Sequence, residues 1–136
     1  MTVSLGTITA RIYAILSGDA QLTVLTGGRI YNDVPQETKF PFIALGGNSA
    51  LFLGTFDASG RSIIYEISIY GKSREIQKIY DIEKRIIELL DRQDEAVEQN
   101  DCIPFFVQYN GTEENPFFDM EQSGRELRVR FDIKHY

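Results

Sequence analysis

Cysteine, histidine and tryptophan are almost missing from this sequence, whose 136 residues include one cysteine, one histidine and no tryptophan. A lone cysteine excludes an internal disulfide, and one cysteine with one histidine excludes a zinc site built from several such ligands in one chain. These scarcities argue against an enzyme, a cofactor-binding protein or a metalloprotein. A chain of this length is expected to fold as a single domain over residues 1–136 around an apolar core.

Positive charge and long apolar runs are scarce as well. The chain has 14 Lys and Arg residues against 20 Asp and Glu residues, a formal net charge of −6. Broad binding to nucleic acid or to anionic lipid requires clustered cations, so neither is expected. The apolar stretches are far shorter than the roughly 20 residues that span a bilayer, and the first residues do not resemble a signal peptide.

The apolar pattern of the first third predicts two helices followed by two short strands. Ser4–Leu16 has its apolar residues at helical spacing, and Asp19 is placed to cap a short second helix that ends at Gly27-Gly28. Strands are expected at Arg29–Tyr31 and at Phe42–Leu45, the second bounded by turn residues.

The middle of the chain predicts a strand and the longest helix. Alternation over Ile63–Ile69 indicates a strand whose polar residues, Glu66 and Ser68, face water. Ser73 is the expected N-cap of a helix that ends near Arg92.

The outer surface of that helix carries acid-before-base pairs four residues apart. Asp81 with Arg85 and Glu88 with Arg92 have this spacing. It predicts a solvated helix face with ion pairs along the helix.

The last third predicts two further strands. Ile103–Tyr109 is the first, Asn110-Gly111 is a strong turn signal, and Leu127–Lys134 alternates apolar and polar residues. The whole pattern predicts an α+β fold, a two-layer domain. It would have a mostly antiparallel sheet of about five strands, with an N-terminal helix and one long helix packed on one face.

Two motifs with possible chemistry are better explained by structure. Gly71-Lys72-Ser73 matches the end of a phosphate-binding loop, but Glu66 stands where that motif requires glycine and residues 66–70 continue a strand. Cys102 and His135 could form a thiolate–imidazole pair, yet a buried thiol and an exposed imidazole near the chain end are the simpler interpretation.

Apolar residues also occur between the expected strands, where a monomer should be polar. Exposed clusters of this kind mark contact surfaces, although the same side chains could fold back onto the core. The candidate interface residues are Leu51, Phe52, Leu53, Phe56, Phe117 and Phe118.

Negative charge is concentrated between Gln93 and Gly124, which contain eight acidic residues and no Lys or Arg. The simplest interpretation is a solvated acidic surface, because the segment lacks the spacing of a known cation-binding loop. A third possibility is that the charge repels a polyanion, which matters only if the protein surrounds one.

Four segments resemble the tail completion proteins of long-tailed phages, which include tail terminators and tail-to-head joining proteins. Leu25–Pro35 and Phe40–Gly46 resemble the N-terminal signature of that family, with its glycine pair, Arg-Ile-Tyr and proline spacing. The similarity continues through Ser62–Leu90 and Gly124–Phe131 and covers nearly the whole chain.

The resemblance implies a small non-enzymatic subunit, without cofactor or metal, that forms a ring, usually a hexamer. Such a ring caps the head-proximal end of the tail tube and joins the tail to the head connector. Its implied partners are copies of itself, the tail tube protein and the head–tail connector, with DNA passing through without specific binding. In such a ring the acidic segment would face the lumen and keep DNA from adhering. The candidate lumen-facing residues are Asp94, Glu95, Glu98, Glu113, Glu114 and Glu121. The implied location is the virion tail, and the host cytoplasm during assembly.

Other functions stay open from the sequence alone. A head-side neck or stopper protein of the same joint would share these features. A small ligand- or nucleotide-binding α/β module, whose one supporting feature is Gly71-Lys72-Ser73, and a monomeric regulatory domain are alternatives from different classes.

Overall fold

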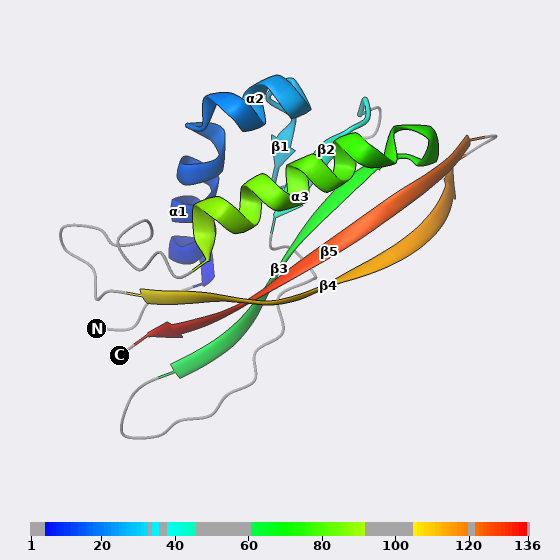
Figure 1. The fold of residues 1–136 in the computed structure, drawn as a ribbon. Helices are drawn as coiled ribbons and strands as arrows, with labels where there is room; N and C mark the ends of the chain where they lie inside the picture. The colour runs from blue at the N-terminus through cyan, green and yellow to red at the C-terminus, as the bar shows by residue number, and fades with distance from the viewer. Residues whose placement is uncertain are drawn as a thin grey trace.

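The computed structural model describes residues 5–32, 34–35, 38–45, 61–91, 105–119 and 122–135. Three α-helices, a short 3₁₀ helix and five strands follow one another in these segments (Figure 1). In chain order they are α1 (Leu5–Ser17), α2 (Ala20–Thr26), β1 (Ile30–Tyr31), β2 (Phe42–Leu45), β3 (Arg61–Lys72), η2 (Ser73–Glu75), α3 (Ile76–Leu90), β4 (Phe105–Asp119) and β5 (Gln122–His135). The predicted order of helices and strands is confirmed.

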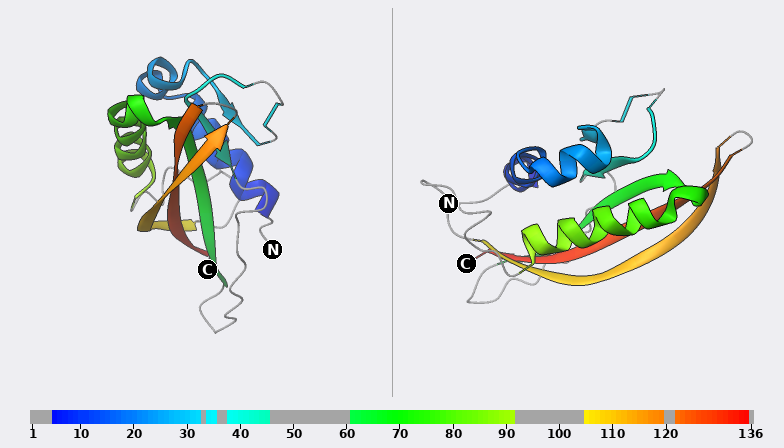
Figure 2. Two further views of the ribbon diagram at one scale, coloured as in Figure 1. Left: turned by 90° about the vertical axis from the view of Figure 1, so that its right-hand side faces the viewer. Right: turned by 45° about the horizontal axis from the view of Figure 1, so that its top comes forward.

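The strands form one five-stranded sheet in the order β1-β2-β3-β5-β4. β1 pairs with β2 in parallel, and every other pairing is antiparallel. β3, β5 and β4 make a long twisted ribbon, and the described helices lie over one side of it (Figures 1 and 2). The α+β prediction, with the long helix packed on one face of a mostly antiparallel sheet, is therefore confirmed.

The core lies between this sheet face and the helices. Alternate residues of β3 and β5 point into it, and residues of all three helices close it from the other side. Burial of each large apolar side chain contributes about 1.5–3 kcal/mol to stability. The buried set includes Ile12, Leu16, Leu22, Tyr65, Ile67, Ile69, Ile79, Ile82, Ile86, Leu90, Leu127, Val129, Phe131 and Ile133.

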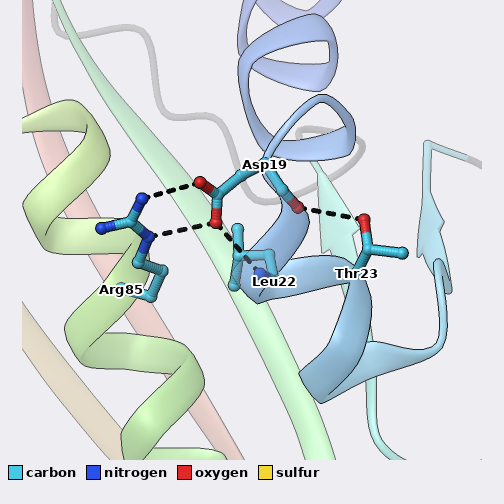
Figure 3. Close-up of polar contacts among 4 residues, drawn as sticks. All are labelled: Asp19, Leu22, Thr23 and Arg85. Atoms are coloured by element: carbon cyan, nitrogen blue, oxygen red, sulfur yellow. Dashed lines mark hydrogen bonds and ion pairs between the residues drawn. The ribbon is translucent and has the colours of Figure 1, made fainter.

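The capping residues of α2 match the sequence prediction. Asp19 Oδ2 accepts a hydrogen bond from the Leu22 backbone N–H at 3.0 Å (Figure 3). Gly27 ends the helix with φ at 66°. The Asp19 carboxylate also receives two hydrogen bonds from Arg85 of α3, at 3.0 and 2.7 Å. Asp19 therefore both starts α2 and ties it to α3.

Gly71 has a packing role rather than a phosphate-binding one. A Cβ at this position would lie 2.6 Å from both Cγ1 and Cδ1 of Ile79, so only glycine lets α3 cross β3 this closely. Residues 66–70 are part of strand β3, as the sequence indicated. The fragment of a phosphate-loop motif is thus explained by the contact between β3 and α3.

The predicted turn at Asn110-Gly111 is wrong. β4 continues through these residues from Phe105 to Asp119, with a bulge between Tyr109 and Gly111. Gly111 has φ at 140°, and the Asn110 side-chain amide donates to Asp132 Oδ1 of β5 at 2.8 Å. Pairing with β5 on both sides of the bulge outweighs the local turn preference, so the glycine bends a strand instead of ending it.

The predicted N-cap at Ser73 is also wrong. Ser73 begins the 3₁₀ helix η2, makes no capping bond, and its hydroxyl accepts a hydrogen bond from Arg125 at 3.1 Å. The long helix begins three residues later, at Ile76. The Ser73 hydroxyl is therefore bound to Arg125 of β5 and does not cap the helix.

The ion pair predicted between Asp81 and Arg85 does not form. Arg85 turns to Asp19 instead, and Asp81 accepts a hydrogen bond from Gln77 at 3.0 Å. A bidentate contact with a nearly buried carboxylate is stronger than an exposed pair along one helix. The second expected pair includes Arg92, which lies outside the described residues.

Candidate functional site

The sheet face turned away from the helices is the candidate functional surface, and we call it the open face. Strand alternation assigns to it Glu66, Ser68 and Tyr70 of β3 and the polar residues of β5. No helix among the described segments covers it (Figures 1 and 2). Two groups of side chains, one charged and one aromatic, occupy this face.

The charged cluster consists of Glu66, Glu113, Glu126, Arg128 and Arg130. Glu66 and Arg130 are directly opposite each other on β3 and β5. Arg130 Nη2 donates to Glu113 Oε2 at 2.7 Å, and its Nε lies 3.9 Å from Glu66 Oε1. Arg128 Nε lies 3.2 Å from Glu126 Oε2. The cluster thus links the three long strands side by side through alternating acids and bases.

The solvated strand face predicted at Glu66 and Ser68 is wrong, because these residues are only 4% and 3% exposed. β3 is the central strand of the sheet, and the arginines opposite these two residues, Arg130 and Arg128, extend over the same face. Alternation gives the correct face but not its burial, since long arginine side chains cover short neighbours.

Glu66 is incompletely satisfied. Its Oε2 atom is buried and has no hydrogen-bond partner, while Oε1 has only the distant contact with Arg130. A buried carboxylate oxygen without a donor is unfavourable, and native structures contain few of them. This atom makes the centre of the open face unusual.

The aromatic cluster lies at the β1–β2 side of the open face and consists of Tyr31, Phe40, Phe42 and Tyr70. The Phe42 ring centroid is 5.0 Å from that of Tyr70, 5.6 Å from that of Phe40 and 6.2 Å from that of Tyr31. Phe42 is buried, whereas the other three rings are partly exposed. Such rings present an apolar surface with fixed geometry.

Arg29 positions this cluster. Its Nε donates to the Pro41 carbonyl oxygen at 3.0 Å and its Nη2 to the Phe40 carbonyl oxygen at 3.4 Å. Together with the pairing of Ile30 to Ile43, these bonds fix the segment that enters β2 beside β1. The Gly-Gly-Arg-Ile-Tyr and Phe-Pro-Phe segments are therefore held together by the Arg29 guanidinium.

Tyr70 connects the two clusters. Its hydroxyl donates to Glu126 Oε2 at 2.7 Å. Burial, and then the neighbouring Glu126 carboxylate, raise the pKa of Tyr70 to about 12. The phenol is therefore a stable hydrogen-bond donor throughout the physiological pH range.

The sequence from residue 10 to residue 135 matches the protein family described as tail completion protein gp17. The chain belongs to this family. It is therefore a structural protein of the phage tail that assembles with other virion proteins. Twenty-one chains of solved structures are similar to it, and no curated protein sequence matches it.

One similar structure is a chain of the virion of a native gene transfer agent (GTA) particle. The two chains share 16% sequence identity with a TM-score of 0.79, over 99% of this chain and 98% of that chain. At this identity the likeness shows a common fold, which extends over nearly the whole length of both chains.

The interface residues expected in this tail completion protein are only partly described. Leu51, Phe52, Leu53 and Phe56 lie outside the described residues. Phe117 and Phe118 belong to β4, where they pair with Gly124 and Ser123, so they lie in a strand and not in a loop. Their role as contacts stays a prediction.

The candidate lumen-facing acidic residues are also only partly described. Asp94, Glu95, Glu98 and Glu121 lie outside the described residues. Glu113 pairs with Arg130 on the open face, while Glu114, on the other face of β4, accepts a hydrogen bond from the Tyr80 hydroxyl at 2.6 Å. Their orientation toward a lumen stays a prediction.

The thiolate–imidazole pair cannot be placed, because Cys102 lies outside the described residues and His135 is assigned only to the backbone of β5. Within the described part of the chain, no group of three acidic, histidine or cysteine side chains is arranged to hold a metal ion. None of the described helices has the length and apolar character needed to cross a membrane.

Sequence reasoning missed the aromatic cluster. Its members come from three places in the chain, and only the parallel pairing of β1 with β2 brings Tyr31 beside Phe42. The sequence held no local signal for it, because β2 is a continuous apolar run and only its register with β3 places Phe42 opposite Tyr70.

Proposed function

We propose that this chain forms a hexameric ring that caps the head-proximal end of the tail tube and joins the tail to the head connector. The observation that carries the proposal is the family match over residues 10–135, because tail completion is the role of that family. A contact between two different patches of identical subunits closes a ring without leaving a free end. The open face, with its partly exposed charges and rings, supplies one such patch.

In this proposal the apolar segment with Leu51, Phe52, Leu53 and Phe56, together with Phe117 and Phe118, contacts neighbouring subunits or the tube end. The double variant Phe52→Asp with Phe56→Asp tests this role. If these residues are contacts, circular dichroism and the melting temperature stay close to those of the wild type, while ring assembly on tail tubes is lost. Loss of the fold would instead assign them to the core.

The acidic residues between Gln93 and Gly124 are proposed to face the lumen and to keep passing DNA from adhering. Like charges repel over a Debye length of about 8–10 Å. Because Arg130 balances Glu113 within the chain, the repulsion comes mainly from Asp94, Glu95, Glu98, Glu114 and Glu121. A ring structure in which residues 93–124 point outward would refute this orientation.

The direct test of the joining role is a phage or prophage deleted for this gene. Electron microscopy should then show tails of abnormal length, or tails detached from filled heads. Complementation with the intact gene should restore normal attached tails. Tails of normal length, firmly joined to filled heads in the deletion strain, would refute the proposal.

A further inference from the structure

Strand β4 forms one edge of the sheet, and its outer side has no strand partner among the described residues (Figure 1). The strand has 15 residues. A long edge strand presents a row of backbone N–H and C=O groups to which a strand of another molecule can add. Two copies of this chain can therefore meet through their β4 edges, in an antiparallel pair with two-fold symmetry, unless the edge is blocked.

The hydrogen bond of the Tyr109 N–H identifies the backbone groups that point outward. This N–H donates to Asp91 Oδ1, at the end of α3, at 2.8 Å, so it points away from β5. Alternate residues of an antiparallel pair direct their backbone groups to the same side, so those of Val107 also point outward. Because β5 keeps an unbroken register with β3, the outward positions shift by one residue beyond the bulge, and they include Thr112 and Pro116.

Three features interrupt this outer edge. The Asp91 carboxylate occupies the Tyr109 N–H, the bulge between Tyr109 and Gly111 breaks the register, and Pro116 has no N–H to offer. The longest uninterrupted stretches are then residues 105–108 and 112–115. Since strands in proteins usually run to about five or six residues, an added strand finds no stretch of ordinary length.

The carboxylate of Asp91 has no evident purpose in its own helix. Asp91 is the C-cap of α3, and the bond it makes there runs from its backbone N–H to the Ile87 carbonyl oxygen at 2.8 Å, which does not involve its side chain. A carboxylate at this end of a helix is disfavoured by the negative pole of the helix dipole. The hydrogen bond to Tyr109 of β4 is therefore the structural reason for an acid at this position.

A second contact holds α3 beside the same strand. The Tyr80 hydroxyl of α3 donates to Glu114 Oε1 of β4 at 2.6 Å. Together with the bond from Tyr109 to Asp91, it fixes α3 to β4 on both sides of the bulge. Asp91 is thus already positioned on the edge before any second molecule arrives.

We propose that Asp91 blocks strand addition at β4: by accepting the Tyr109 N–H, it keeps two copies from pairing through this edge. Its removal leaves residues 105–109 as an uninterrupted edge of ordinary strand length. A two-fold dimer closes on itself and adds no third copy, unlike the head-to-tail contact that builds a ring. The benefit to assembly rests on the proposed ring, whereas the blocking role itself does not.

Three variants of the purified full-length protein test this role without tail tubes, so the result does not depend on the ring. Asp91→Ala removes the acceptor, Asp91→Asn keeps an oxygen without the charge, and Asp81→Ala is the matched control, with the same loss of charge at an exposed position of α3. By sedimentation velocity, Asp91→Ala should form dimers at a concentration at least about tenfold lower than the other two variants and the wild type. Dimerisation like the wild type, or equal dimerisation of Asp81→Ala, overturns the proposal.

Amide hydrogen exchange, followed by NMR, tests whether β4 is the edge involved. In the wild type the Tyr109 amide should exchange more slowly than the outward amide of Thr112, another half-buried residue, and dilute Asp91→Ala should lose this difference. At higher concentration the Val107 and Tyr109 amides of Asp91→Ala should become protected as the edges pair. Equal exchange of Tyr109 and Thr112 in the wild type, which needs no variant to fold, overturns the proposal. A dimer of Asp91→Ala that leaves these amides unprotected overturns it as well.

Discussion

Alternate residues of β5 face opposite environments. Leu127, Val129 and Phe131 are 1%, 0% and 0% exposed beneath the helices, whereas Arg128 and Arg130 keep 43% and 37% of their side chains exposed on the open face. The covered face is apolar and closely packed, and the open face consists of ion pairs and aromatic rings. Because its residues alternate between the two faces, β5 contributes both to the apolar core and to the charged surface.

The covered face contributes most of the stability of the fold, whereas the open face is suited to contact with other molecules. Burial of apolar side chains contributes about 1.5–3 kcal/mol for each residue, while a partly exposed ion pair contributes about 0–1 kcal/mol. The charged cluster is thus a weak explanation of the fold and a better explanation of contact with another molecule. We expect substitutions on the two faces to have effects of different kinds.

The largest expected effect comes from removing a ring on the covered face. Phe131→Ala should lower the free energy of unfolding by about 3–5 kcal/mol, because it leaves a cavity in a closely packed core. Arg128→Ala, three residues away on the open face, should cost less than about 1 kcal/mol. Urea denaturation of both variants measures the comparison, and equal losses would show that the open face also stabilises the fold.

The sequence predicted the covered face well and the open face poorly, for physical reasons. Alternation identifies Leu127, Val129 and Phe131 as core residues, because burial under helices depends on local spacing. The burial of Glu66 depends on which residues of β5 lie opposite it, and the cluster around Phe42 depends on which strands are neighbours. Such long-range pairings are not encoded in a local pattern.

The same reasoning explains the wrong turn at Asn110-Gly111. The dipeptide has strong local turn chemistry, but β5 offers pairing partners along the whole of β4 and the bulge absorbs the extra residue. The caps at Asp19 and Gly27 were predictable because capping is a contact between close neighbours in the sequence.

An intermediate effect is expected for the ion pair within the helical layer. Asp19→Asn keeps a capping oxygen but removes the charge that binds Arg85, whereas Asp19→Ala removes both. The alanine variant should lose about 0.5–2 kcal/mol of stability from the cap in addition to the lost ion pair. Because Arg85 is 26% exposed, against 43% for Arg128 and 37% for Arg130, and makes two hydrogen bonds to Asp19, this pair should be stronger than the open-face pairs.

The pH dependence of unfolding in acid gives an independent measure of the stability that the Asp19–Arg85 ion pair contributes. Hydrogen bonding from Arg85 is the main cause that lowers the pKa of Asp19 below its ordinary value of 3.8. The pair therefore stabilises the fold fully above that value, and the contribution is lost as the pH falls through the lower pKa of the folded state. The difference in urea midpoint between wild type and Asp19→Asn should shrink over that range. A difference independent of pH would show that the charge is not the cause.

The smallest expected effects concern the ionisation of one tyrosine on each face of the sheet, which alkaline titration measures. Burial raises the pKa of Tyr65, which hydrogen-bonds to Thr9 under the helices, to about 12, and the pKa of Tyr70 on the open face also rises to about 12. Both contributions to stability are complete below pH 10 and are lost as the pH rises through about 12.

The two faces should differ in how these phenols ionise. Tyr65 is 0% exposed, so its ionisation should coincide with unfolding, whereas Tyr70 is partly exposed and should ionise with the fold intact. Tyrosinate absorbance can be followed cleanly, because the chain has seven tyrosines and no tryptophan. Tyr70→Phe should remove one group that titrates in the native state and shift the alkaline unfolding midpoint less than Tyr65→Phe does, because Tyr65 cannot ionise without unfolding. If Tyr70→Phe shifts the midpoint as much as Tyr65→Phe does, ionisation on the open face is coupled to unfolding as strongly as ionisation on the covered face.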